Sequence, residues 1–314
     1  MDKDLKRPKI SIIMPAYNAS NYIGEAITSV IAQTFTSWEL IIVDDGSVDA
    51  TAKIANEWVT KDQRIQYYYQ ENGKQGKARN LGISKSKGVY LAFLDADDIW
   101  MPEKLEIQLQ EIKEKNVDLV FSDSYIIRDA FEAIKNKRMN IPNGVFYAKD
   151  DLNSFLEENK IPILTVLVKK EKVVDVGGFS EVLDVQNVED YHLWLKLLMT
   201  NCAFYASGNV LAEYRIHNHS ATANDKQALD KIPAAFFDLL QQYPSYKSQI
   251  RQELKIKFKL LYKRNLFTKD ELSIWIKKNT QYFSKTQLSY LYLLLNFLLP
   301  TKVTKRILIY LLNA

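Results

Sequence analysis

Five short apolar runs, separated by stretches of helical periodicity, constrain the fold of this chain more than any other feature. The runs lie at residues 9–14, 40–43, 65–69, 89–94 and 117–122. The runs 40–43 and 89–94 are continuously apolar, as strands buried on both faces of a sheet are. Apolar residues recur every three or four positions between them, which predicts helices at 22–33, 51–59, 75–84 and 102–115. Strands alternating with helices predict an α/β fold with parallel strands and helices on both faces of an open sheet.

The remainder of the chain divides into an irregular stretch, a second group of elements and a helical end. Residues 124–165 show no clear periodicity. The elements expected after them are a strand at 165–168, a helix at 170–176 that stops at Gly177-Gly178, a helix at 189–199 and a strand at 210–217. After Asn224 the sequence is helical, basic and aromatic. We therefore expect an α/β domain at 1–222 and a basic helical C-terminal region at 223–314.

The counts of cysteine and histidine exclude several kinds of site. The single Cys202 excludes a disulfide framework and a multi-cysteine zinc site, and fits a reducing cytoplasm. Three histidines make a histidine-rich metal site unexpected. No apolar core of signal-peptide length precedes Pro15, so no export signal is expected.

Two clusters of aspartates follow predicted strands directly. Asp44 and Asp45 follow the second strand, and Asp95, Asp97 and Asp98 follow the fourth. Ligands of such sheets lie outside the carboxyl ends of the strands, so both clusters are expected at one edge. Closely spaced carboxylates tolerate one another when Mg²⁺ or Mn²⁺ lies between them. The alternative is that Asp97 or Asp98 caps the following helix, which leaves the other carboxylates of its cluster unexplained.

The front two-thirds of the chain resembles a family 2 glycosyltransferase of the GT-A fold, in which a Rossmann-like nucleotide-binding sheet carries helices on both faces. The matching stretches are SIIMPAYNASNYIGEAITSVIAQTFTSWELIIVDDGSVDAT, GKARNLGI, LAFLDADDIWMPEKL, GGFSE and EDYHLWLKL. They occur in the family's order and cover roughly residues 9 to 220. Together they are far more specific than an Asp-x-Asp motif alone.

The resemblance implies a role for each of a set of residues. Those expected to bind the nucleotide sugar are Pro15, Ala16, Tyr17, Asp44, Asp45, Arg79, Asp95 and Ala96. Within this group Asp45 would meet the uracil edge, Arg79 would support the base and ribose, and Asp95 would reach the donor's ribose or sugar. Asp97 would bind the Mn²⁺ or Mg²⁺ that bridges the diphosphate, with His217 near the metal. Asp190 would be the general base, and the acceptor side would include Gly178, Phe179 and Glu189.

Each of these residues also has a purely structural alternative. Asp44 and Asp45 could form the turn before Gly46, and Arg79 could be a surface cation. Asp190 could be a carboxylate favoured at a helix start by the helix dipole. A lone histidine such as His217 is often structural. Arg215, two residues before it, could pair with the diphosphate.

The implied reaction is an inverting, metal-dependent transfer by a hexosyltransferase of class EC 2.4. The donor would be a UDP-sugar, and the acceptor a hydroxyl of a glycan or lipid-linked glycan in bacterial surface polysaccharide synthesis (O-antigen, capsule or lipooligosaccharide). The Gln-x-x-Arg-Trp run of processive members is absent from the sequence, which favours addition of a single sugar. The alternatives are a non-catalytic carbohydrate-binding or scaffolding protein on the same fold, and a sugar-nucleotide nucleotidyltransferase. A phosphatase with an Asp-x-Asp nucleophile would carry that motif after its first strand, not its fourth.

The C-terminal region differs in charge from the rest of the chain. Residues 226–314 contain 16 Lys and Arg against 5 Asp and Glu, whereas residues 1–225 contain 26 against 33. The uncharged stretch 286–301, TQLSYLYLLLNFLLPT, is too short and too polar for a membrane span. With its basic flank it predicts an amphipathic segment on an anionic membrane surface, or alternatively a packed bundle or homodimer interface. We expect a cytoplasmic protein, peripheral on the inner face of the cytoplasmic membrane, without a nucleic-acid partner.

Overall fold

The structure, a computed structural model, describes residues 7–128, 137–217 and 225–263. The chain divides into two compact units, residues 1–224 and 225–314. The boundary predicted at residue 222 falls within 218–224, outside the described residues. The uncharged stretch 286–301 lies outside them as well. Each unit is described by itself.

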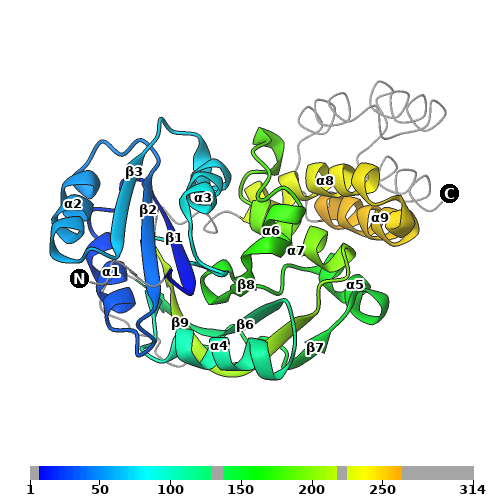
Figure 1. The fold of residues 1–314 in the computed structure, drawn as a ribbon. Coiled ribbons are helices and arrows are strands. Elements are labelled where there is room, and N and C mark those ends of the chain that lie inside the picture. The colour runs from blue at the N-terminus through cyan, green and yellow to red at the C-terminus, as the bar shows by residue number, and fades with distance from the viewer. Residues whose placement is uncertain (1–6, 129–136, 218–224, 264–314) are drawn as a thin grey trace. The chain divides into compact units, whose positions relative to one another are not determined.

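The first half of unit 1 has the predicted alternation of strands and helices. Four parallel strands lie in the order β3-β2-β1-β4, and their bounds are Ile65–Tyr69, Trp38–Asp44, Ile10–Ala16 and Tyr90–Phe93. The helices that connect them are α1 (Ile23–Ile31), α2 (Thr51–Lys61) and α3 (Lys74–Lys85). Figure 1 shows α1 and α2 on one side of these strands and α3 on the other. The α/β fold class expected from the sequence is confirmed.

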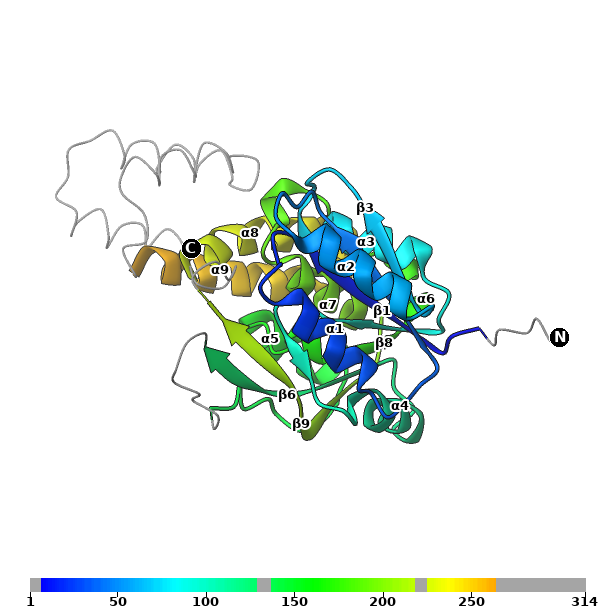
Figure 2. The same ribbon diagram turned by 90° about the vertical axis from the view of Figure 1, so that its left-hand side faces the viewer.

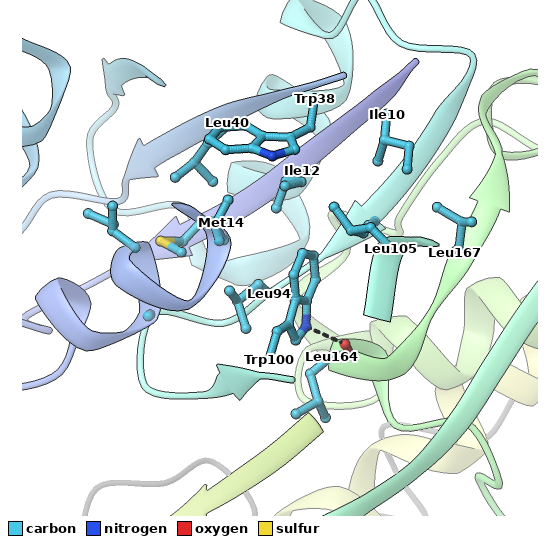
Figure 3. Close-up of a cluster of buried hydrophobic side chains, with 14 of the residues drawn as sticks. Ile10, Ile12, Met14, Trp38, Leu40, Leu94, Trp100, Leu105, Leu164 and Leu167 are labelled. Atoms are coloured by element: carbon cyan, nitrogen blue, oxygen red, sulfur yellow. Dashed lines mark hydrogen bonds between the residues drawn. The ribbon is translucent and has the colours of Figure 1, made fainter. Parts of the chain in front are cut away.

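The two faces of this sheet have separate cores. Alternate side chains of β1, such as Ile12 and Met14, lie in a buried cluster with residues of α1 and β2, and Figure 3 shows them beside Trp38 and Leu40. The same cluster contains Trp100, whose indole N–H donates to the Leu164 carbonyl at 2.7 Å. Burying this apolar surface is the main favourable contribution to folding.

On the opposite face α3 lies directly against the sheet. A Cβ atom added to Gly82 would lie 2.6 Å from the Ile13 side chain, so this helix position has room only for glycine. Ile13 and Ile83 are both buried. The close packing fixes α3 against the strand ends, and α3 carries Arg79 and Asn80.

The second half of the sheet is mixed, which differs from the parallel arrangement predicted. Strand β8 (Leu167–Lys169) lies antiparallel between β4 and β6 (Leu119–Arg128), and the long β9 (Phe204–Ile216) runs parallel to β6. Two short strands, β5 (Ile99–Trp100) and β7 (Gly144–Phe146), pair antiparallel with β9. Within the residues that the structure describes, the sheet has nine strands. Local periodicity reveals that a strand exists but not which neighbour it pairs with, so the antiparallel β8 was not foreseeable.

Four helices accompany this half: α4 (Lys104–Glu114), α5 (Ala148–Glu157), α6 (Lys170–Asp175) and α7 (Glu189–Met199). Figure 2 shows α4 and α7 from a second direction. Helix α5 and strand β7 lie within residues 124–165, where no periodicity predicted an element. The single turns η1 (Ile163–Thr165) and η2 (Leu183–Val185) precede β8 and α7. The predicted site residues Glu189 and Asp190 lie at the start of α7, and His217 follows the end of β9.

Unit 2 is helical in its described part. Helices α8 (Asp225–Gln242) and α9 (Lys247–Lys263) pack against each other and are joined by the short turn η4 (Pro244–Tyr246). On α9, Lys257 pairs with Glu253 at 3.2 Å, and both side chains are buried. Among the helices of residues 7–128, 137–217 and 225–263, none is long and apolar enough to cross a membrane.

Candidate active site

The acidic turn after β4 gives each of its three carboxylates a different partner. Asp95 Oδ1 accepts a hydrogen bond from Arg79 Nη2 at 2.8 Å, and Asp97 Oδ2 lies 2.9 Å from His217 Nε2. Asp98 Oδ1 accepts from the backbone N–H of Arg215 at 2.8 Å and is almost fully buried. The expectation that Asp98 caps the next helix is therefore wrong. Strand β5 follows the turn, and α4 begins only at Lys104.

Asp97 and His217 come from the ends of two different elements. Asp97 follows β4 and His217 follows β9, and their pairing places a carboxylate and an imidazole side by side. The ring of Tyr22 stacks on His217 with centroids 4.9 Å apart. Arg215 Nε donates to the Asp97 carbonyl at 2.8 Å, while its Nη2 pairs with Glu25 at 2.6 Å. The two predicted metal residues are thus brought together and held by contacts from α1 and β9.

The electrostatics of this turn fit a divalent cation. Burial and the Asp95 carboxylate raise the pKa of Asp97, although the His217 hydrogen bond opposes them. Burial and the charges of Asp97 and Asp95 raise the pKa of Asp98 well above its usual range. A bound cation would lower the pKa values of these carboxyl groups, because its charge favours ionised carboxylates. Carboxylate and imidazole are suitable donors for Mn²⁺, and carboxylate for Mg²⁺.

The donor set is small. Within the part of the chain that the structure describes, no group of three or more His, Cys, Asp or Glu side chains is arranged to hold a metal ion. Mg²⁺ in phosphate-transfer sites commonly uses one or two carboxylates, with waters and substrate phosphates completing the shell. Asp97 and His217 fit that pattern, in which the nucleotide itself supplies ligands.

Arg79 links the acidic turn to the start of α7. Its Nη2 pairs with Asp95 at 2.8 Å and its Nη1 pairs with Glu189 at 2.7 Å. The Arg79 and Glu189 side chains are only 4% and 6% exposed, so the alternative of a surface cation is wrong for Arg79. Glu189, predicted on the acceptor side, points its carboxylate into this buried pair. The guanidinium is therefore committed to two carboxylates, and positions them relative to each other.

We expect Arg79→Met to lower the free energy of unfolding by about 3–5 kcal/mol, because it leaves the Glu189 charge buried without its partner. Urea unfolding followed by circular dichroism measures the change. The double variant Arg79→Met/Glu189→Gln should recover most of the loss. Lys149→Met, which removes a cation paired at 3.6 Å on the surface, should leave stability unchanged. Equal stability of Arg79→Met and the native protein would contradict the role of this pair.

Asp190 lies beside this arginine network, in the first turn of α7. Its Oδ1 accepts the backbone N–H of Tyr191 at 2.6 Å, and its Oδ2 accepts the side-chain amide of Asn159 at 3.1 Å. Burial and the Glu189 carboxylate raise the pKa of Asp190 to about 7, against the opposing effects of Arg79 and of both hydrogen bonds. The carboxylate does satisfy an N–H of the helix start, as the structural alternative proposed. A pKa near neutrality also suits a general base.

The glycine turn before α7 is clamped to α3 by Asn80. The Asn80 amide donates to the Phe179 carbonyl and accepts from the Phe179 N–H, both at 2.9 Å. Gly178 has φ +70°, and a Cβ there would lie 2.6 Å from Asn80 Oδ1, so a glycine is required. Phe179 itself is buried, edge-on to Phe93. Of the predicted acceptor-side residues, Gly178 and Phe179 thus shape the turn, and both are buried.

Part of the predicted nucleotide site lies where β1 and β2 end, and Ala96 follows β4. The Asp45 N–H donates to the Ala16 carbonyl at 2.8 Å, which joins the two strand ends. Tyr17 is 54% exposed there, whereas Pro15, Ala16 and Ala96 are buried. Tyr17 is therefore the member of this group whose ring is available to a ligand.

Asp44 and Asp45 are both buried and hydrogen-bonded, more extensively than a simple turn requires. Asp44 accepts from the Ser47 N–H and from the Tyr67 hydroxyl, both at 2.8 Å. The Asp45 carboxylate accepts from the N–H groups of Gly73 and Lys74, where α3 begins, at 2.7 and 2.9 Å. Contact of Asp45 with a uracil remains a prediction.

For three residues of the site, no role was predicted from the sequence. Asn80 follows Arg79 within GKARNLGI, so the motif contained it but did not indicate its clamp on Phe179. Tyr22 lies just before α1 and gave no signal of its stacking on His217. Asn159 belongs to the stretch without periodicity, and its contact with Asp190 spans 31 positions.

Comparison with known proteins agrees with the arrangement. The family model described as glycosyl transferase family 2 matches residues 11–175. The putative teichuronic acid biosynthesis glycosyltransferase TuaG of Bacillus subtilis is 34% identical over 226 residues, which are 72% of this chain and 86% of that protein. The UDP-Glc:alpha-D-GlcNAc-diphosphoundecaprenol beta-1,3-glucosyltransferase WfgD of Escherichia coli is 33% identical over 226 residues, 71% of this chain and 83% of that protein.

Solved structures share the fold. Residues 1–349 of S. aureus TarS, crystallised with UDP-GlcNAc, superpose with a TM-score of 0.64 at 18% identity, over 81% of this chain and 73% of that one. The mannosyltransferase PcManGT from Pyrobaculum calidifontis, in complex with GDP-Man and Mn²⁺, gives a TM-score of 0.58 at 14% identity, over 99% of this chain and 89% of that one.

Proposed function

This chain belongs to glycosyl transferase family 2, and we propose that it moves one sugar from a UDP-sugar to a hydroxyl of a glycan or lipid-linked glycan in bacterial surface polysaccharide synthesis. The observation that carries the proposal is the chain of ion pairs Asp95–Arg79–Glu189, in which Arg79 and Glu189 are buried and Asp95 is partly exposed. It joins the turn that holds Asp97 to the helix start that holds Asp190. A candidate metal site and a candidate base are thereby fixed to the same arginine.

The proposed reaction is a direct displacement with inversion. The acceptor hydroxyl must lose a proton, and Asp190, whose pKa lies near 7, can take it at Oδ1 or Oδ2. A divalent cation held by Asp97 and His217 would neutralise charge on the leaving diphosphate as a Lewis acid. Arg79 orients Asp95 at the donor side and Glu189 beside the base. One base and one metal-holding carboxylate suffice for a single displacement.

The names and ligands of similar proteins guide the choice of donor and acceptor. TarS has been crystallised with UDP-GlcNAc, and the name of WfgD gives a UDP-Glc donor and a diphosphoundecaprenol-linked GlcNAc acceptor. TuaG is named for teichuronic acid biosynthesis. We propose for this chain a UDP-hexose or UDP-N-acetylhexosamine donor and a lipid-linked glycan acceptor of the same chemical class.

The test is a panel of UDP-sugars, each incubated with Mn²⁺ and a short-chain GlcNAc-diphospholipid or other glycan acceptors. Release of UDP together with a product heavier by one sugar supports the proposal. Proton NMR of the anomeric centre determines whether configuration is inverted. Formation of pyrophosphate from a sugar phosphate and UTP would instead identify a nucleotidyltransferase. Glycan binding without any turnover across the panel would favour the non-catalytic alternative.

We also propose that the basic C-terminal region attaches the protein to the inner face of the cytoplasmic membrane. Each Lys or Arg near an anionic surface contributes about 1 kcal/mol, and residues 226–314 hold 16 of them against 5 acidic residues. Full-length protein should sediment with vesicles of phosphatidylglycerol and phosphatidylcholine at low salt, and leave them at high salt. A chain ending at Asn224, shown to be folded by circular dichroism, should stay in the supernatant. Absence of sedimentation at low salt would favour a packing or homodimer role for this region.

A further inference from the structure

Asn159 donates a hydrogen bond to Asp190, the candidate base. It lies just after α5, and its Nδ2 donates to Asp190 Oδ2 at 3.1 Å. The other oxygen, Oδ1, accepts the Tyr191 N–H at 2.6 Å. Both carboxylate oxygens of Asp190 therefore have a donor, one from its own helix and one from a different segment. Two donors on two oxygens fix the plane of the carboxylate.

The orientation of the Asn159 amide is determined by its other contact. Its Oδ1 accepts the backbone N–H of Ile161 at 3.2 Å. Reversing the amide would place its oxygen against the Asp190 carboxylate and its NH₂ against the Ile161 N–H, so both contacts would become repulsive. Ile161 is fully buried, which anchors the loop on that side. The NH₂ group is consequently directed at Asp190.

Helix α5 is tied to α7 at the same place. The Tyr191 hydroxyl lies 2.8 and 2.7 Å from the carbonyls of Phe155 and Leu156, in the last turn of α5, and its single hydrogen is shared between these two acceptors. Those carbonyls lack partners within their own helix, so the tyrosine satisfies groups that would otherwise be unpaired. Asn159 follows this junction by three residues. The loop that carries the amide is thus fixed to the helix that carries the base.

We propose that Asn159 is a positioning residue for the general base, whose amide orients the Asp190 carboxylate and keeps it ionised until the acceptor hydroxyl gives up its proton. The inference rests on the proposed role of Asp190 in sugar transfer. An amide NH₂ can donate but cannot accept the proton, so it favours the carboxylate over the acid throughout the reaction.

The charged groups around Asp190 make this donor important. Burial and Glu189 raise the pKa of Asp190, and Arg79 and the two hydrogen bonds lower it. The segment before Asn159 contributes Glu158, whose Oε1 accepts from Lys160 Nζ at 2.7 Å, so this pair adds little net charge. Loss of the amide therefore leaves Arg79 and the Tyr191 N–H to oppose burial and Glu189. The pKa of Asp190 should then rise.

The test compares Asn159→Ala with the native protein and with Asn153→Ala, a control that removes an exposed asparagine of α5. The first readout is the pKa of Asp190, followed by NMR of ¹³C-labelled aspartate carboxyls and assigned with Asp190→Asn. The second is the pH profile of kcat and of acceptor KM in sugar transfer from the UDP-sugar that the panel identifies. The NMR readout needs no turnover, so it separates failure of this inference from failure of the proposed function.

In Asn159→Ala the pKa of Asp190 should rise, the acid limb of kcat should move to higher pH, and kcat at pH 7 should fall about tenfold. Part of the loss in kcat should persist at pH values well above the Asp190 pKa of either protein. The variant loses the fixed orientation of the carboxylate as well as the stabilisation of its charge. Asn159→Asp should lose more, since it places a like charge beside the base. Asn153→Ala should match the native protein. An unchanged pKa in Asn159→Ala, or a loss confined to acceptor KM, would overturn the proposal.

Discussion

Asp97→Ala should abolish sugar transfer, with a loss of at least about 10³-fold, because it removes the carboxylate proposed to hold the divalent cation. The cation is expected to stabilise charge on the leaving diphosphate by several kcal/mol. We expect His217 alone not to hold the cation. UDP release and product formation measure the loss. Titration of Mn²⁺ by electron paramagnetic resonance in the presence of UDP should show weakened binding in the same variant. Asp150→Ala, which removes an exposed aspartate of α5, is the control.

The same substitution should not unfold the protein. Asp97 is 30% exposed, and burial and Asp95 already disfavour its charge. Removing the carboxylate also relieves repulsion at Asp98, which Asp97 and Asp95 surround. The urea midpoint of Asp97→Ala should therefore equal or exceed that of the native protein. Full transfer activity in EDTA, or in Asp97→Ala, would show that the metal assignment is wrong.

The fold was predictable where the signal is local. Strands β1 to β4 and the helices between them follow from apolar runs and helical periodicity, which are properties of the local sequence. Strand β8 was expected at about the right place, but its antiparallel insertion between β4 and β6 depends on long-range contacts. Strand β9 begins at Phe204 rather than at 210, because its first part pairs with β6 across about 85 positions.

The candidate site was predictable as a set of residues, less so as a set of contacts. The resemblance indicated Asp97 and His217 as metal residues, and the structure places them 2.9 Å apart. For Arg79 the resemblance indicated support of the base and ribose, but not its buried pairing with Glu189, 110 positions away. Asn159 has no motif and lies in a stretch without periodicity, so only the folded chain shows its contact with Asp190, the proposed base.

The prediction for Asp190→Asn distinguishes the base from its neighbour. General-base assistance contributes about 10² to 10⁴ in rate, so the variant should lose activity of that order while binding UDP and Mn²⁺ normally. The asparagine side chain has the shape of aspartate and retains an oxygen for the Tyr191 N–H, so α7 should still begin correctly. Calorimetric titration of UDP with Mn²⁺ and single-turnover transfer rates measure the two effects separately.

The pH dependence provides an independent check of the same assignment. A base acts when it is ionised, so native activity should fall as the pH drops through about 7, where Asp190 becomes protonated. The residual activity of Asp190→Asn should lack this acid limb. Glu189→Gln should retain the limb, displaced to lower pH, because the Glu189 charge raises the pKa of Asp190. Suppose that Glu189→Gln is inactive although circular dichroism shows it folded, and that Asp190→Asn is active. Glu189 would then be the base that takes the proton, and Arg79 would pair directly with that base.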